Sequence, residues 1–202
     1  MSNKEVTNEI LDAPPPDYDN KLYDLVKSSY KRNKEAEQIG GKYGLKLDPL
    51  LSNSEHKVFV DPNTNNTNVV FTGTRKFGDV LTDGALLFGL GKYTKRFKDS
   101  DKLIKDVRNK YTNGLISTSG DSLGGTLAGY VKADSKITFN KGTGLGDIGK
   151  NIGKNQIDIR TKYDPVSLLS KTQTHANKQI NIKSRYLDPH KYKDLHNRRL
   201  FF

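Results

Sequence analysis

The residues with the clearest chemical potential form a short glycine–serine–glycine turn. Residues 120–124 read Gly-Asp-Ser-Leu-Gly, a G-x-S-x-G pattern centred on Ser122. Residues 115–119, which precede it, are typical of a buried strand, and the apolar side chains from Leu123 to Val131 recur at helical spacing. A sharp turn from a strand into a helix can present a serine hydroxyl as a nucleophile, because it lifts the side chain clear of the sheet.

The same turn has features that would stabilise an oxyanion. A sharp turn leaves no room for side chains two residues before or after Ser122, which accounts for Gly120 and Gly124. Ser122 would lie at the N-terminus of the helix, where free N–H groups and the helix dipole favour negative charge. The backbone N–H of Leu123 would then donate to the oxyanion. The alternative interpretation is structural, a glycine-rich turn in which Ser122 only caps the following helix.

Length and composition limit the classes of protein to consider. The chain of 202 residues is long enough for one domain with a core, and its 33% hydrophobic content leaves part of the chain for loops or tails. It contains no cysteine, which excludes a disulfide framework and a thiolate zinc site. We find no secretory signal in residues 1–20 and no bilayer-spanning apolar run, so we expect a cytoplasmic or virion-associated protein.

The charge is distributed unevenly along the chain. The net charge is +11, and it divides into −4 over residues 1–20 and +15 over the remainder. A basic body attracts anionic lipid, nucleic acid or an acidic partner, although a solvated basic surface is the plainer interpretation. Nucleic acid ranks last, because no recognised nucleic-acid-binding motif is present. An anionic membrane surface is a candidate partner, with contacts expected from Lys92, Lys95, Arg96 and Lys98.

Residues 1–20 are predicted to be a disordered acidic tail, and residues 21–202 a single domain. The tail contains a P-P-x-Y motif formed by Pro15, Pro16 and Tyr18. Such segments bind the aromatic grooves of WW domains as polyproline II helices, although a chance match is the alternative. Flexible tails of viral structural proteins carry this motif. Together with the lysine- and asparagine-rich composition, it hints at a virus-encoded protein.

The remaining elements alternate between helix and strand. Turn signals and apolar spacing predict a loop over residues 42–54, and helices over residues 21–38 and 100–111, the second capped by Ser100. A hairpin is expected from residues 57–61 and 68–72. Three further strands are expected over residues 136–140, 157–161 and 179–183. The order predicts an α/β fold with a mainly parallel sheet, an antiparallel N-terminal hairpin and helices on both faces.

Six short motifs in a fixed order resemble the class 3 (fungal-type) lipases, which are α/β-hydrolases. They lie between about residues 55 and 195, and the order makes them more specific together than any one alone. The motifs are V-F-T-G-T at residues 70–74, D-V-L-T-D at 79–83, G-D-S-L-G-G at 120–125, I-T-F-N at 137–140, D-P-V at 164–166 and D-P-H-K-Y at 188–192.

The resemblance implies a role for five residues of this sequence. Ser122 would be the nucleophile, Asp164 the orienting acid and His190 the base of a catalytic triad. Thr74 and the amide of Leu123 would form the oxyanion hole. The implied activity is hydrolysis of carboxylic esters, with an acyl lipid or phospholipid as the substrate and with no metal or organic cofactor.

Other residues leave alternatives open. His196 is a rival base to His190, whereas His175 falls where the family often has a non-catalytic histidine. Asp121 and Thr72 replace the histidine and the arginine that the family carries at these positions. The alternative to an enzyme is therefore a catalytically inactive, lipase-fold structural or virion protein that docks through its basic surface and P-P-x-Y tail.

Overall fold

The computed structural model describes residues 8–11, 20–74, 94–142, 151–152, 155–161, 174–175 and 178–182. Its main element is an eight-stranded sheet with the strand order β1-β10-β8-β6-β5-β4-β3-β2. These strands are β1 (Asn8–Leu11), β2 (Lys46–Leu47), β3 (His56–Val60), β4 (Thr67–Phe71), β5 (Ile116–Asp121), β6 (Ser135–Phe139), β8 (Gln156–Thr161) and β10 (Lys178–Ile182). Two short strands, β7 (Asn151–Ile152) and β9 (Thr174–His175), pair separately.

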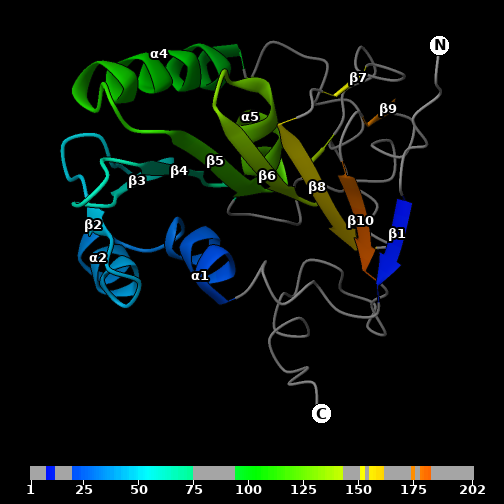
Figure 1. Ribbon diagram of the computed structural model, residues 1–202, viewed down its shortest axis with the longest axis horizontal. Helices are drawn as coiled ribbons and strands as arrows, with labels where there is room; N and C mark the ends of the chain where they lie inside the picture. The colour runs from blue at the N-terminus through cyan, green and yellow to red at the C-terminus, as the bar shows by residue number, and fades with distance from the viewer. Residues whose placement is uncertain are drawn as a thin grey trace.

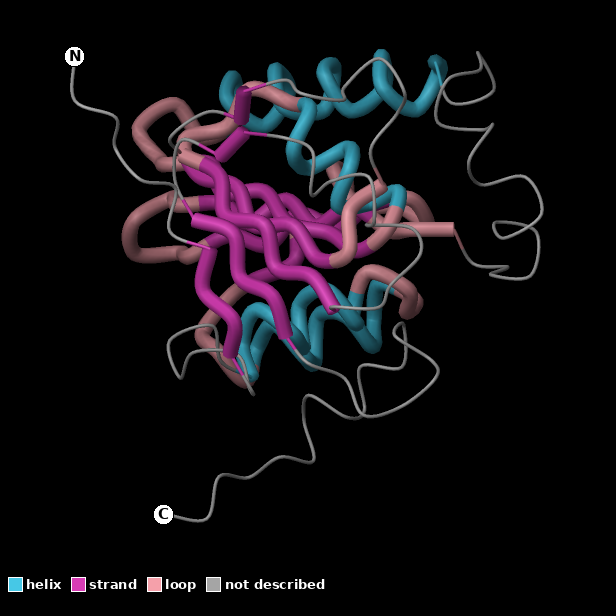
Figure 2. Tube along the Cα trace, turned by 90° about the vertical axis from the view of Figure 1, so that its right-hand side faces the viewer, coloured by secondary structure: helices cyan, strands magenta, loops and turns pink. Residues whose placement is uncertain are grey.

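The sheet is mostly parallel and is covered by helices on both faces. The antiparallel pairs of this sheet are those of β3 with its two neighbours, β4 and β2. Helices α4 (Thr94–Lys110) and α5 (Leu123–Tyr130) cover one face, and α1 (Asn20–Ser28) and α2 (Asn33–Gly41) cover the other (Figures 1 and 2). The predicted α/β fold class, with its antiparallel N-terminal hairpin, is confirmed.

Alternating apolar residues in the hairpin build two separate cores. Val58 and Val69 are fully buried beneath α4 and α5, whereas Phe59 and Val70, one residue further along each strand, are fully buried against α1 and α2. Because successive side chains of a strand point to opposite faces, a continuous run of apolar residues marks a strand that is buried on both sides. This pattern is why β4 lies inside the sheet, next to β5.

The helix predicted over residues 21–38 is two helices in the structure. The hydroxyls of Ser28 and Ser29 donate to the carbonyls of Leu25 and Val26, at 2.7 Å and 2.8 Å, and Arg32 is extended, with ψ of 156°. Serine hydroxyls compete for helical carbonyls, and they weaken a helix where two follow one another. The prediction of one continuous helix was therefore wrong, and the break places Tyr30 in a connecting segment.

Three other boundaries differ from the prediction. Helix α4 begins at Thr94, so Ser100 lies inside it and donates to the Phe97 carbonyl at 2.7 Å instead of capping it. Strand β2 lies within the predicted loop 42–54. Strand β1 lies within the predicted disordered tail, where a parallel partner, β10, supplies the hydrogen bonds that no local pattern reveals. The division of the chain at residue 20 is otherwise still a prediction.

Candidate functional site

The serine turn (residues 120–124) joins β5 to α5 through a strained residue. Ser122 has φ of 54° and ψ of −121°, a region that residues other than glycine rarely occupy. Its backbone N–H donates to the Phe139 carbonyl of β6 at 2.9 Å, and it is 7% exposed. Its hydroxyl does not cap α5, so the purely structural interpretation of Ser122 as a helix cap finds no support.

The two glycines of the serine turn are required by close backbone packing. A Cβ on Gly120 would collide with the carbonyl group of Gly124 and lie 2.8 Å from the Phe71 carbonyl oxygen. A Cβ on Gly124 would collide with the same Phe71 oxygen and lie 3.0 Å from the Gly73 nitrogen. These neighbours are the adjacent helix and the adjacent strand, as the sequence predicts, and neither backbone can move aside.

The register of the sheet brings a second segment next to the serine turn. Phe71, the last residue of β4, pairs with Gly120 of β5, so residues 72–74, which we call the β4 exit segment, emerge at the same edge. Thr74 and Leu123, the two predicted oxyanion residues, line one pocket of about 300 Å³. The other lining residues are Ser54, Glu55, Thr72, Gly73 and Arg96.

An ion pair forms one wall of this pocket. The Arg96 guanidinium donates to the Thr72 carbonyl at 2.8 Å and lies 3.7 Å from the Glu55 carboxylate. The Arg96 side chain is 18% exposed and that of Glu55 49% exposed, so water screens the pair only partly. From the sequence, Arg96 is predicted only as a basic surface contact. The residues around Arg96 contain no pattern that predicts its contact with the end of β4.

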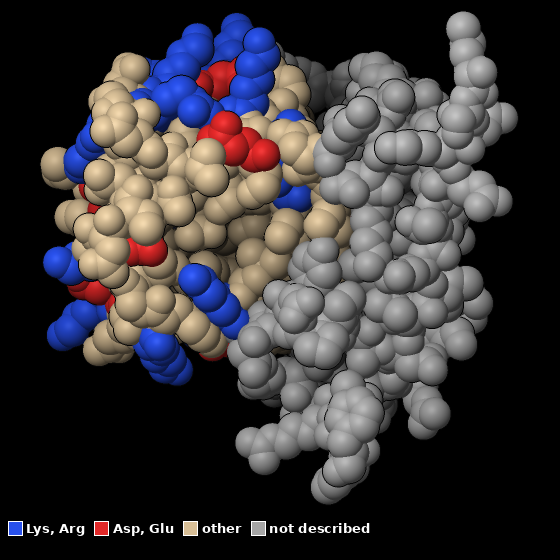
Figure 3. Space-filling model, viewed as in Figure 1, with Lys and Arg blue, Asp and Glu red and all other residues tan. Residues whose placement is uncertain are grey.

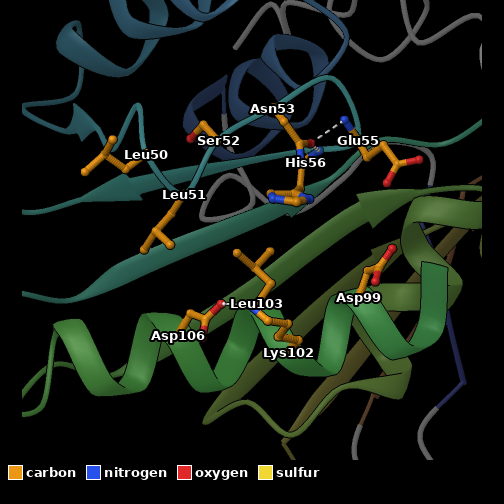
Figure 4. Close-up of a pocket in the computed structure, with 10 residues that line it drawn as sticks. All are labelled: Leu50, Leu51, Ser52, Asn53, Glu55, His56, Asp99, Lys102, Leu103 and Asp106. Carbon is orange, nitrogen blue, oxygen red and sulfur yellow. Dashed lines mark hydrogen bonds and ion pairs between the residues drawn. The ribbon is translucent and has the colours of Figure 1, made fainter. Parts of the chain in front are cut away.

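A second pocket, of about 270 Å³, shares Glu55 with the first (Figure 4). It lies between α4 and the segment that leads into β3, with His56 pointing into it, as do Leu51 and Leu103. Burial, together with the nearby charges of Lys57 and Arg96, lowers the pKa of His56 to about 4. A histidine that is neutral over the physiological range has no need of an ion-pair partner.

A buried carboxylate on β8 is fully used by structural contacts. Asp158 accepts hydrogen bonds from Thr138 at 2.6 Å and Gln156 at 2.8 Å through one oxygen, and pairs with Lys141 at 2.7 Å through the other. Asp158 and Lys141 are 3% and 7% exposed. Through these contacts Asp158 holds β6 to β8 and to the loop after β6.

Several predicted site residues lie outside the described residues. Asp164 follows β8, which ends at Thr161 on the same sheet edge as β5, but neither it nor His190 is described. The same applies to His196, to residues 79–83 and to the motif residues Pro15, Pro16 and Tyr18. Among the described residues, no group of three or more histidine, cysteine or acidic side chains could hold a metal ion. No helix in this part of the chain could cross a bilayer.

Comparison with known proteins identifies the fold. No family model and no curated protein sequence matches the chain. Among solved structures, Lip2 lipase from Yarrowia lipolytica superposes with a TM-score of 0.53 at 15% identity, covering 86% of this chain and 82% of that one. A point mutant of MDLA from Penicillium cyclopium gives a TM-score of 0.50 at 15% identity, with the same coverage. The chain has a class 3 lipase-like fold, as the motif order predicts, and the hint of viral origin stays a prediction.

Proposed function

We propose that this protein is a serine hydrolase that cleaves carboxylic esters, with an acyl lipid or phospholipid as its substrate. One observation supports this most strongly. Ser122 is held in a strained conformation that its glycine neighbours make possible, and it lies next to a pocket lined by Thr74 and Leu123. Strain of this kind is retained where a side chain must be presented for chemistry.

The proposed reaction proceeds in two steps at Ser122. The hydroxyl attacks the ester carbonyl while the base removes its proton, and the alcohol leaves with that proton to give an acyl-enzyme. Water, activated by the same base, then releases the acid. The N–H of Leu123, the start of α5 and Thr74 would stabilise the negative charge on the carbonyl oxygen in both steps. In this proposal His190 is the base and Asp164 orients it.

Kinetics of single variants test the triad. Ser122→Ala and His190→Ala are each expected to lower ester turnover at least about 10³-fold without loss of the fold. His196→Ala is the matched control and is expected to keep activity near that of the wild type. Unchanged turnover in Ser122→Ala would exclude Ser122 as the nucleophile, and a wild type without turnover would favour the inactive structural protein. Loss of activity in His196→Ala but not in His190→Ala would move the base to His196.

We further propose that the substrate is presented on an anionic lipid surface that contacts α4. Basic side chains gather on the surface over this helix (Figure 3). Four exposed lysines recur along one stripe of α4 at helical spacing, and Arg96 of the same helix lines the pocket. These four are Lys95, Lys98, Lys102 and Lys105, which we call the α4 lysine stripe.

Vesicle binding tests this surface. Replacing the four lysines of the α4 lysine stripe by glutamine is expected to weaken binding to vesicles with anionic lipid by up to about 10³-fold, at about 1 kcal/mol per lysine near the surface. The wild-type interaction is expected to weaken as salt rises. The control makes the same four replacements at exposed lysines near α2, which are Lys31, Lys34, Lys42 and Lys46. Equal binding to neutral and anionic vesicles, or an equal loss in the control, would contradict this proposal.

The tail motif supports a separate partner. In this proposal Pro15, Pro16 and Tyr18 bind a WW domain, with the tyrosine ring in the aromatic groove. Tyr18→Ala is expected to abolish capture by WW domains without changing ester turnover. If the protein binds no domain in a panel of WW domains, the P-P-x-Y motif is a chance match.

A further inference from the structure

The β4 exit segment (residues 72–74) is held from one face of the sheet by Tyr30. The backbone N–H of Gly73 donates to the Tyr30 hydroxyl oxygen at 3.0 Å. A Cβ on Gly73 would lie 2.5 Å from that oxygen and 2.6 Å from the carbonyl oxygen of Asp121. Gly73 therefore lies between the Tyr30 hydroxyl and the residue that precedes Ser122, with no room for a side chain.

Two further contacts fix the same segment. The Thr72 hydroxyl donates to the Ser29 carbonyl at 2.9 Å, and Thr72 is 2% exposed. From the opposite face, the Arg96 guanidinium donates to the Thr72 carbonyl at 2.8 Å. Two elements that are far apart in the sequence therefore hold the β4 exit segment from opposite faces of the sheet. They are the α1–α2 connection and α4.

We infer that Tyr30 is a positioning residue for the oxyanion hole, which rests on the function proposed above. Its hydroxyl fixes Gly73 and hence the direction in which Thr74 meets the pocket beside Leu123. Donors to an oxyanion accelerate a reaction only when they are aligned before charge develops, and small displacements are costly. Tyr30 acts through the backbone of Gly73 and has no need to touch the substrate.

This role predicts a specific kinetic signature. Tyr30→Phe removes the acceptor of the Gly73 N–H and leaves the ring in place. Because the oxyanion exists in the transition state and not in the bound ester, kcat is expected to fall about tenfold while KM stays unchanged. The rate of covalent labelling by a fluorophosphonate, which passes through a similar charged state, is expected to fall by the same factor.

A second tyrosine provides the matched control. The Tyr43 hydroxyl donates to the Asp24 carboxylate at 2.7 Å, within the same helical layer, and Tyr43 lines neither pocket. Tyr43→Phe therefore also removes one tyrosine hydroxyl and its hydrogen bond, outside the candidate site. It is expected to lower the denaturation midpoint about as much as Tyr30→Phe, yet to change kcat and the labelling rate less than about twofold.

A second variant pair keeps the inference testable if Tyr30→Phe does not fold. Arg96→Lys keeps the charge in the pocket but loses the planar fork that reaches the Thr72 carbonyl, and it is expected to give the same kcat-only loss. Its control is Arg108→Lys, further along α4, where the arginine pairs with Asp134 at 3.3 Å.

The outcomes separate this inference from the proposed function. If the wild-type protein does not react with the fluorophosphonate, the proposed function fails and the inference falls with it. If the wild-type protein reacts and Tyr30→Phe reacts no more slowly than Tyr43→Phe, the inference alone is wrong. An effect on KM with kcat unchanged would also overturn it, because that result assigns Tyr30 to substrate binding.

Discussion

The two segments that meet at the candidate site are specified in different ways. The sequence signal for the serine turn lies within five consecutive residues, since Gly120 and Gly124 leave the room that the neighbouring backbone occupies. The β4 exit segment contains little that fixes its own shape and is held by Ser29, Tyr30 and Arg96. One half of the site is therefore local in the sequence, and the other half depends on the completed fold.

The largest loss of stability is expected from a substitution in the serine turn, the half of the site whose sequence signal is local. Gly120→Ala places a methyl group against the backbone of both Gly124 and Phe71, and it should destabilise the fold by at least about 3 kcal/mol. The control is Gly41→Ala at the end of α2, where a Cβ would meet nothing within 4 Å. There we expect a gain of about 0.5–1 kcal/mol, because alanine favours a helix. Denaturant unfolding measures both, and equal stabilities would contradict local control of the turn.

An intermediate loss of stability is expected from a substitution in the β4 exit segment, the half of the site that depends on long-range contacts. Thr72→Val removes a buried hydroxyl and leaves the Ser29 carbonyl without this donor, at a cost of about 1–3 kcal/mol. Thr126→Val removes a half-buried hydroxyl of α5 that lies 3.2 Å from the Ser122 carbonyl oxygen in the serine turn and 2.9 Å from the Gly142 carbonyl oxygen after β6. We expect that change to cost about 0.5 kcal/mol, because backbone geometry defines the turn. A larger loss in Thr126→Val than in Thr72→Val would reverse the comparison.

A separate effect, of pH and not of substitution, is an acid sensitivity on the β4 side. The pKa of His56 falls from 6.5 to about 4, chiefly through burial, and its ring lies 6.4 Å from that of Phe71. Above pH 6.5 the histidine is neutral in both folded and unfolded chains. Between pH 6.5 and 4 only the unfolded chain takes up the proton, so stability falls as pH falls through this window.

Melting temperatures across this window test the assignment to His56. His56→Gln is expected to flatten the decline between pH 6.5 and 4. As a control, Asp48→Asn should leave that slope intact. Burial raises the pKa of Asp48, but hydrogen bonds from Lys110 and Tyr111 outweigh it and hold the pKa below 3.8. An unchanged slope in His56→Gln would assign the acid sensitivity to other groups.

This contrast explains what the sequence could predict. The hairpin, the parallel strands and the serine turn follow from alternation, helical spacing and glycine positions, all of which are local signals. The hydrogen bonds of Tyr30 and Arg96 to residues 72–74 are not local, because each joins positions more than twenty residues apart. The break after Ser29, which places Tyr30 beside Gly73, was missed because the apolar spacing continues across it.

Edge strands were also beyond local prediction. Strand β2 is two residues long, and β1 lies in an acidic, proline-containing segment with few apolar residues. Both owe their conformation to a neighbouring strand, β3 or β10, so their signals lie in the partner. The triad assignments of Asp164 and His190 rest on motif order, and they stay predictions until activity is measured.

Covalent labelling of the intact protein tests the central claim most directly. The claim is that the strained turn presents Ser122 as the nucleophile that the base activates. A fluorophosphonate is expected to modify the folded protein at one residue, and peptide mapping should locate it at Ser122. Ser122→Ala and the denatured wild type should remain unlabelled, because the hydroxyl alone is a weak nucleophile. Absence of labelling in the folded wild type, or equal labelling in Ser122→Ala, would contradict the account.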